Sequence, residues 1–151
     1  MEDERKKYES DGFNKLVVDP TNVLLSSYKN FDKINFNLQT KIKFEDDKGA
    51  IDAGGLFREW VNLSIIEAFS PDLGMFKLCE TDETAYKIVV SKANFQVFVE
   101  IGRILGFVIG KSLIEKIPLN CYFNRTLYRI LANQPIYLSD MYNYDIGVIN
   151  S

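Results

Sequence analysis

Hydrophobic side chains recur at three- and four-residue steps in two long segments of the chain. The first segment covers residues 56–69 and ends there because Pro71 cannot continue a helix. The second covers residues 92–116 and ends before Pro118. The apolar stripe of the first segment contains Leu56, Phe57, Trp60, Val61, Ile65, Ala68 and Phe69. Both patterns predict long helices that bury one wide face.

Two shorter helices are predicted on either side of this pair. Asp19 is expected to cap the first of them, with Pro20 at the first helical position, where a missing N–H costs nothing. Val23 and Leu24 then fall on its buried face. The other short helix covers residues 122–131.

Polar and apolar residues alternate with a period of two at positions 41–44. This alternation predicts a strand with Ile42 and Phe44 on the same, buried side. Residues 74–78 and 86–90 are predicted to be two further short extended segments. The fold class is therefore α+β, mostly helical, with short antiparallel strand pairs.

The chain has 151 residues, of which 46% are hydrophobic, so one globular domain with its own core is expected. Residues 1–10 carry seven charged side chains and offer nothing to bury. We therefore divide the sequence into a charged N-terminal extension, residues 1–16, and a folded part, residues 17–151.

The residue types exclude much of enzyme chemistry. There is no histidine, so triads with a histidine base, histidine-based zinc sites and imidazole general bases are excluded. The two cysteines, Cys79 and Cys121, are not spaced as a metal site, and neither lies beside an activating base or cation. We interpret both as unreactive, and we expect no cofactor and no metal.

Charge patterning bears on partners and location. The 18 basic residues are interleaved with 21 acidic ones, an arrangement that does not favour nucleic-acid binding. No apolar segment follows the charged opening, and Arg103 and Lys111 interrupt the most apolar helix well short of the about 20 residues that span a membrane. No membrane contact is expected, and the predicted location is cytoplasmic, with nuclear as the alternative.

Three glycines, Gly102, Gly106 and Gly110, fall four residues apart in the second long helix. This spacing predicts that another backbone approaches the helix closely on that side. The tripeptide Gly110-Lys111-Ser112 also resembles the end of a phosphate-binding P-loop. However, only three residues separate Gly106 from Gly110, where the P-loop has four, so nucleotide binding stays a weak alternative.

Two charged residues, Asp52 and Arg103, are predicted from their sequence neighbours to have specific polar partners. Asp52 precedes Gly54-Gly55 and can accept hydrogen bonds from free N–H groups of that turn, where glycine permits unusual backbone angles. Arg103 lies among apolar residues, and a buried guanidinium needs an anion. The hypothesis is that Glu59 or Asp52 supplies that anion.

Four segments with recognisable motifs follow one another along the chain, namely residues 41–44, 52–60, 69–76 and 98–106. In this order they resemble the opening half of a HECT-type ubiquitin ligase catalytic domain. The resemblance runs from about Val17 to Ser151, with loops of compatible length. The residues that match the family motifs, all in structural roles, are Asp52, Gly54, Gly55, Glu59, Trp60, Pro71, Gly74, Phe76, Gly102, Arg103 and Gly106.

The resemblance implies part of a two-lobed enzyme. Its N-terminal lobe docks a ubiquitin-conjugating enzyme, and a cysteine on its C-terminal lobe accepts ubiquitin as a thioester and passes it to a substrate lysine. This chain is expected to be the scaffold of the N-terminal lobe, without the conjugating-enzyme-binding subdomain and the C-terminal lobe, and inactive alone. Neither Cys79 nor Cys121 matches the catalytic cysteine, so no catalytic residue is carried over.

Three further expectations concern partners. Some ligases of this family bind a second ubiquitin near residues 73–80 through aromatic side chains, where this chain has Leu73 and Leu78. The alternative function is a non-catalytic helical protein-interaction module. Self-association of the chain is also expected, through exposed apolar side chains near its C-terminus, namely Ile146, Val148 and Ile149.

Overall fold

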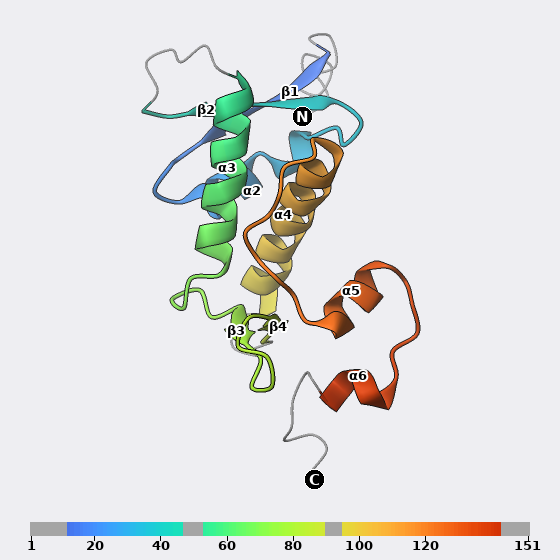
Figure 1. Ribbon diagram of the computed structural model, residues 1–151. Coiled ribbons are helices and arrows are strands. Elements are labelled where there is room, and N and C mark those ends of the chain that lie inside the picture. Colours follow the sequence, from blue (N-terminus) through green and yellow to red (C-terminus); the bar gives the residue numbers. More distant parts are fainter. Residues whose placement is uncertain (1–11, 47–52, 90–94, 143–151) are drawn as a thin grey trace. The chain divides into compact units, whose positions relative to one another are not determined.

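The computed structural model describes residues 12–46, 53–89 and 95–142 (Figure 1). The chain divides into two compact units, Met1–Ala68 with Asn94–Leu119, and Phe69–Ala93 with Asn120–Ser151. The helices and strands of the first unit are β1 (Phe13–Val18), α2 (Val23–Lys29), a 3-10 turn (Phe31–Lys33), β2 (Gln39–Phe44), α3 (Ala53–Ala68) and α4 (Phe95–Ile114). Those of the second unit are β3 (Phe76–Leu78), β4 (Tyr86–Ile88), α5 (Arg125–Leu131) and α6 (Leu138–Tyr142). The α+β, helix-rich class is confirmed.

Strands β1 and β2 form a two-stranded sheet in the first unit. Their burial alternates along each strand, so Leu16 and Val18 face the core opposite Ile42 and Phe44. The predicted strand at 41–44 is thus confirmed, but this pair is parallel rather than antiparallel, because α2 connects β1 to β2 as a crossover. β1 also begins at Phe13, so four residues assigned to the charged extension belong to the sheet.

Helix α2 begins three residues later than the sequence predicts. Its N-cap is Asn22, and its first residue is Val23. The Asp19 carboxylate instead accepts hydrogen bonds from the backbone N–H and the hydroxyl of Thr21, at 2.8 and 2.7 Å. These bonds close a turn ahead of the helix and hold the pKa of Asp19 below its usual value.

Helices α3 and α4 supply the core of the first unit, as predicted from their periodicity. α3 buries Phe57, Trp60, Val61 and Ile65 and ends at Ala68, three residues before Pro71. The buried positions of α4 are Ile101, Ile104, Leu105, Phe107, Val108, Lys111 and Ser112. Within the described residues, no helix is both long enough and apolar enough to cross a bilayer.

The second unit is built around a small sheet and a cluster of aromatic rings. β3 and β4 pair in antiparallel fashion, which confirms the two predicted extended segments. Residues 122–124 lie beside β4, since the Tyr86 N–H donates to the Tyr122 carbonyl at 2.8 Å and the Asn124 N–H donates to the Tyr86 carbonyl at 3.0 Å. The rings of Phe69, Phe76, Tyr86 and Phe123 pack together against this sheet.

Candidate functional site

The motif residues of α3 have three different environments. Trp60 is fully buried, and its indole N–H donates to the Ser27 hydroxyl at 2.9 Å. Gly54 and Gly55 lie in the first turn of the helix, so they do not use the unusual backbone angles that glycine permits. Glu59 is exposed. Asp52 falls outside the described residues, so its predicted turn contacts and its predicted pairing with Arg103 stay predictions.

Arg103 is exposed on α4, which contradicts the premise that its guanidinium is buried. Within the part of the chain that the structure describes, no carboxylate forms an ion pair with it, so the predicted pairing with Glu59 is wrong. The physical reason is the helical position. Arg103 follows the exposed Gly102 and points away from the buried stripe that includes Ile101 and Ile104, so water solvates its charge.

The glycines of α4 do not bring another backbone close among the described residues. A Cβ atom built at Gly102, Gly106 or Gly110 meets nothing within 4 Å. The prediction of a close approach is therefore wrong. The reason is that the contacts of α4 with α2 and α3 are made by its apolar stripe, and the glycines lie on a different side of the helix.

The segment that resembled a P-loop is continuous α-helix. Lys111 lies inside α4 and is only 7% exposed. Its ammonium donates to the backbone carbonyls of Phe36 and Leu38, at 3.1 and 2.7 Å. The lysine therefore fastens the loop before β2 to α4, and its side chain is not directed to a phosphate.

In the second unit, Pro71 and Gly74 shape the turn that precedes β3. The N–H of Leu73 donates to the Ser70 carbonyl at 3.1 Å, and Gly74 has a φ of 65°, which glycine adopts without strain. Phe76 is buried directly after this turn. Leu73 is half-buried and Leu78 is 46% exposed, so the predicted ubiquitin contact at these two residues stays a prediction.

Both cysteines are buried free thiols. Burial raises the pKa of Cys121 to about 11, because the charged thiolate loses its hydration. Burial also raises the pKa of Cys79, and the positive charge of Lys87 opposes that shift only in part. A nucleophilic cysteine needs the opposite shift, so the structure gives neither thiol an activating environment.

We expect iodoacetamide to modify the folded chain far more slowly than the unfolded chain. With a pKa of about 11, about one Cys121 thiol in a thousand is ionised at pH 8, and alkylation of Cys121 should be about two orders of magnitude slower than in urea. The rate should rise as the pH approaches 11, because only the thiolate reacts and its fraction increases with pH. Mass spectrometry of quenched samples measures both rates, and equal rates in the folded and unfolded chains would contradict the prediction.

Among the residues that the structure describes, no group of three or more histidine, cysteine, aspartate or glutamate side chains is placed to hold a metal ion. The acidic loop between β3 and β4 is organised locally. Asp82 accepts from the N–H and hydroxyl of Thr84, at 3.0 and 2.6 Å, and these bonds lower the pKa of Asp82.

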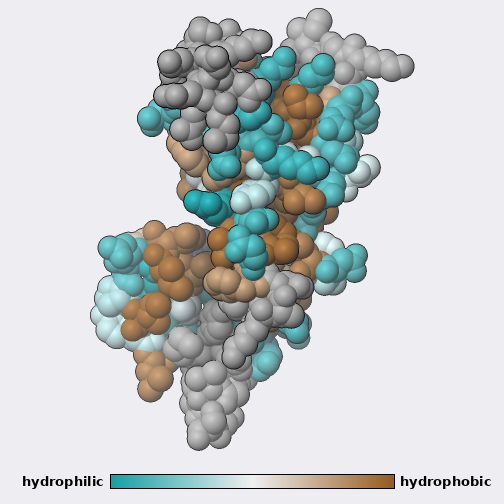
Figure 2. Space-filling view, turned by 180° about the vertical axis from the view of Figure 1, so that it is seen from behind, coloured by the Kyte–Doolittle hydropathy of each residue, from teal (hydrophilic) through white to brown (hydrophobic). Residues whose placement is uncertain are grey.

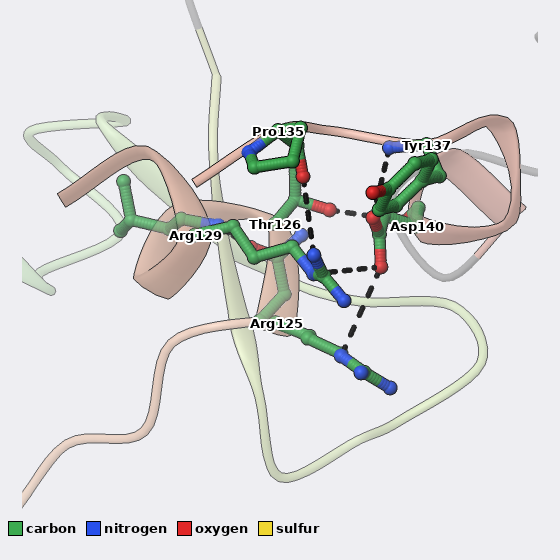
Figure 3. Close-up of polar contacts among 8 residues, drawn as sticks. Arg125, Thr126, Arg129, Pro135, Tyr137 and Asp140 are labelled. Carbon is green, nitrogen blue, oxygen red and sulfur yellow. Dashed lines mark hydrogen bonds and ion pairs between the residues drawn. The ribbon is translucent and has the colours of Figure 1, made fainter. Parts of the chain in front are cut away.

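A buried polar cluster lies between α5 and α6 and is centred on Asp140 (Figure 3). Asp140 is only 5% exposed, and its Oδ1 lies 3.3 Å from Nε of Arg129 and 3.8 Å from Nε of Arg125. Its Oδ2 accepts a hydrogen bond from the Tyr137 N–H at 2.9 Å. Its backbone carbonyl accepts from the Thr126 hydroxyl at 3.0 Å. One residue thus fastens the start of α6 to α5.

Sequence reasoning missed this cluster, although a local signal was present. Asp140 follows Tyr137 by three residues, the spacing at which an acidic side chain reaches back to a free N–H at a helix start. Arg129 also fastens the segment between α5 and α6, because its guanidinium donates to the Pro135 carbonyl at 3.1 Å. The periodicity of so short a helix was too weak to reveal α6.

The two helices that Asp140 joins also carry exposed hydrophobic side chains. Figure 2 shows hydrophobic side chains gathered over α5 and α6, at its lower left. The large hydrophobic side chains that are exposed on α5, on α6 and on the segment that connects them are Tyr128, Ile130, Leu131, Ile136, Tyr137 and Leu138. A surface of this kind on a rigid polar support is typical of a protein–protein contact, and it offers no group for catalysis.

Comparison with known proteins supplies the family. Residues 62–151 match the family model described as HECT-domain (ubiquitin-transferase). The chain is 32% identical over 118 residues to the E3 ubiquitin-protein ligase TOM1-like of Neurospora crassa, covering 78% of this chain and 3% of that protein. It is 31% identical over 140 residues to the E3 ubiquitin-protein ligase Nedd-4 of Drosophila melanogaster, covering 87% of this chain and 13% of that protein.

A third relative, the probable E3 ubiquitin-protein ligase TOM1 of Eremothecium gossypii, is 29% identical over 133 residues, which cover 85% of this chain and 4% of that protein. The chain therefore spans a small share of the ligases that it matches. The family match covers more than half of the chain, and the helix-rich α+β fold agrees with the resemblance noted in the sequence. The chain belongs to the HECT family of ubiquitin-transferases and corresponds to the first part of the N-terminal lobe.

Proposed function

We propose that this chain is the scaffold of the N-terminal lobe of a HECT-type E3 ubiquitin ligase. The observation that carries the proposal is the family match over residues 62–151. The buried, high-pKa thiols of Cys79 and Cys121 support it, because a scaffold needs no reactive cysteine. The aromatic core of each unit and the Asp140 cluster are the features that a rigid support requires.

In the proposed reaction, ubiquitin moves in two transfers. A cysteine thiolate outside this chain attacks the thioester that joins ubiquitin to the conjugating enzyme and releases the conjugating enzyme's thiol. A substrate lysine amine then attacks the new thioester, forms an isopeptide bond and releases the ligase thiol. This chain would support the rest of the N-terminal lobe, which would hold the conjugating enzyme and ubiquitin in place. The proposed location is the cytoplasm or nucleus.

A ubiquitin-charging assay tests whether the cysteines of this chain accept ubiquitin. The chain is incubated with activating enzyme, conjugating enzyme, ATP and ubiquitin, and the products are separated with and without reducing agent. We expect no reducible ubiquitin adduct on this chain, because its thiols are buried and protonated. An adduct that disappears in Cys121→Ser or Cys79→Ser would contradict the proposal.

A chimera tests whether this chain can serve as the scaffold of an active ligase. The matching segment of Drosophila Nedd-4 is replaced by this chain, and self-ubiquitination of the chimera is measured. We expect activity above that of a chimera in which the segment also carries Trp60→Ala. If the segment is instead a non-catalytic interaction module, as the hydrophobic surface of α5 and α6 would allow, the chimera has no activity although it folds.

A further inference from the structure

A hydrophobic groove of about 440 Å³ lies in the first unit, between α4 and the segment that leads to β2. Gly106, Gly110 and Ile114 line it from the helix, and Phe31 and Phe36 line it from the opposite side. Phe36 is 55% exposed and Ile114 is 68% exposed, so apolar surface in the groove faces solvent. All lining residues belong to one unit, and the groove does not depend on the proposed function.

The walls of the groove are fixed before any partner arrives. The Phe36 ring packs edge-on against Phe107, with 5.3 Å between centroids, and against Phe31, at 5.6 Å. Lys111 holds the same segment by its hydrogen bonds to the carbonyls of Phe36 and Leu38. A preformed groove binds with a smaller loss of conformational entropy than one that must be ordered on binding.

The floor of the groove has the dimensions of a helix site. Its lining positions on α4 extend from Arg103 to Ile114, a rise of about 16 Å, which matches three turns of a second helix. Gly106 and Gly110 have no Cβ, and a Cβ built at either position would meet no neighbouring atom within 4 Å. A helix backbone can therefore approach α4 closely there, with side chains on either side of the glycines.

The charge of the groove has one sign. The two charged side chains that line it, Arg103 and Lys111, are both cationic. The Lys111 ammonium is occupied by two carbonyls, whereas the exposed Arg103 guanidinium has no carboxylate paired with it among the described residues. A carboxylate on the bound segment would gain a bidentate partner at that end of the groove.

We propose that this groove binds an amphipathic helix of a partner protein, with three or four large apolar residues on one face and a carboxylate beside them. The backbone of the bound helix would lie over Gly106 and Gly110, and its apolar residues would pack on either side of these glycines, against Phe36 and Ile114. The carboxylate would pair with Arg103 and fix the orientation of the helix. Such recognition uses anchors at positions i, i+3 or i+4, and i+7 of the bound segment.

The test uses the whole chain and two labelled helical peptides of about 16 residues, which present leucines on one face. One peptide has glutamate beside the leucines, and the other has lysine at the same positions. Binding is measured by fluorescence anisotropy. We expect saturable binding of the glutamate peptide, and about fivefold or more weaker binding of the lysine peptide and of Arg103→Gln with the glutamate peptide.

A matched pair of glycine variants places the site. Gly106→Leu fills the groove, whereas Gly102→Leu adds the same side chain to the same helix outside it; both positions have open space, so both variants should fold, as circular dichroism will check. We expect Gly106→Leu to abolish binding and Gly102→Leu to retain it. The proposal is overturned if the glutamate peptide does not bind, if the two glycine variants behave alike, or if the lysine peptide binds equally well.

Discussion

Replacing Trp60 with alanine is expected to destabilise the first unit by about 3–5 kcal/mol, the cost of removing a large aromatic side chain from a packed core. Trp60 has no exposed surface, and its ring lies 5.4 Å from Phe57 and 6.0 Å from Phe107, centroid to centroid. Urea unfolding followed by circular dichroism is the measurement, because the variant lacks the protein's single tryptophan.

Two controls separate burial from other effects. Ile66→Ala removes a side chain that is 68% exposed on the same helix, and it should change stability by about 0.5 kcal/mol or less. Ser27→Ala keeps the Trp60 ring but leaves its buried N–H without an acceptor, which should cost about 1–3 kcal/mol. Equal unfolding midpoints for Trp60→Ala and Ile66→Ala would refute the core position of Trp60.

Asp140→Ala should produce the second large effect, a loss of about 3 kcal/mol in the second unit. The substitution leaves the mostly buried Arg129 without its carboxylate and the Tyr137 N–H without its acceptor. We place the value at the low end for a broken buried pair, since Arg129 keeps its bond to the Pro135 carbonyl. Hydrogen exchange at the amides of α5 and α6 measures the loss, because both helices depend on this residue.

The other members of the cluster provide graded controls. Arg125→Ala should cost less than about 1 kcal/mol, because the Arg125 side chain is 70% exposed and lies 3.8 Å from the carboxylate. Asp140→Asn keeps an oxygen that can accept from the Tyr137 N–H. Its loss of stability should therefore fall between the losses of Arg125→Ala and Asp140→Ala. If Arg125→Ala and Asp140→Ala raise amide exchange equally, the central role assigned to Asp140 is wrong.

Local patterns predicted the elements that depend on local properties. The three- and four-residue spacing identified α3 and α4, and the alternation at 41–44 identified β2. Pro71 and Pro118 correctly set limits for the two long helices. These features succeed because helix periodicity, strand alternation and the missing N–H of proline act within one or two turns of chain.

Elements whose stability depends on distant residues were missed or misplaced. β1 has alternating burial only because it pairs with β2, more than 20 positions later. The five-residue α6 is too short for a periodic signal, and it is held through Asp140 by Arg129 and Thr126 of α5. Self-association through Ile146, Val148 and Ile149 concerns positions outside the described residues and stays a prediction.

The sequence by itself determined the family, the helix-rich class, the two long helices and the burial of Trp60, because apolar spacing and motif order are present in the chain before it folds. Only the tertiary structure decided that β1 and β2 run parallel, that Arg103 is exposed, that Gly106 and Gly110 open into a groove, and that Asp140 is buried between two arginines. The physical reason is that periodicity identifies a helix face, whereas the neighbours that cover or leave open that face come from remote parts of the chain.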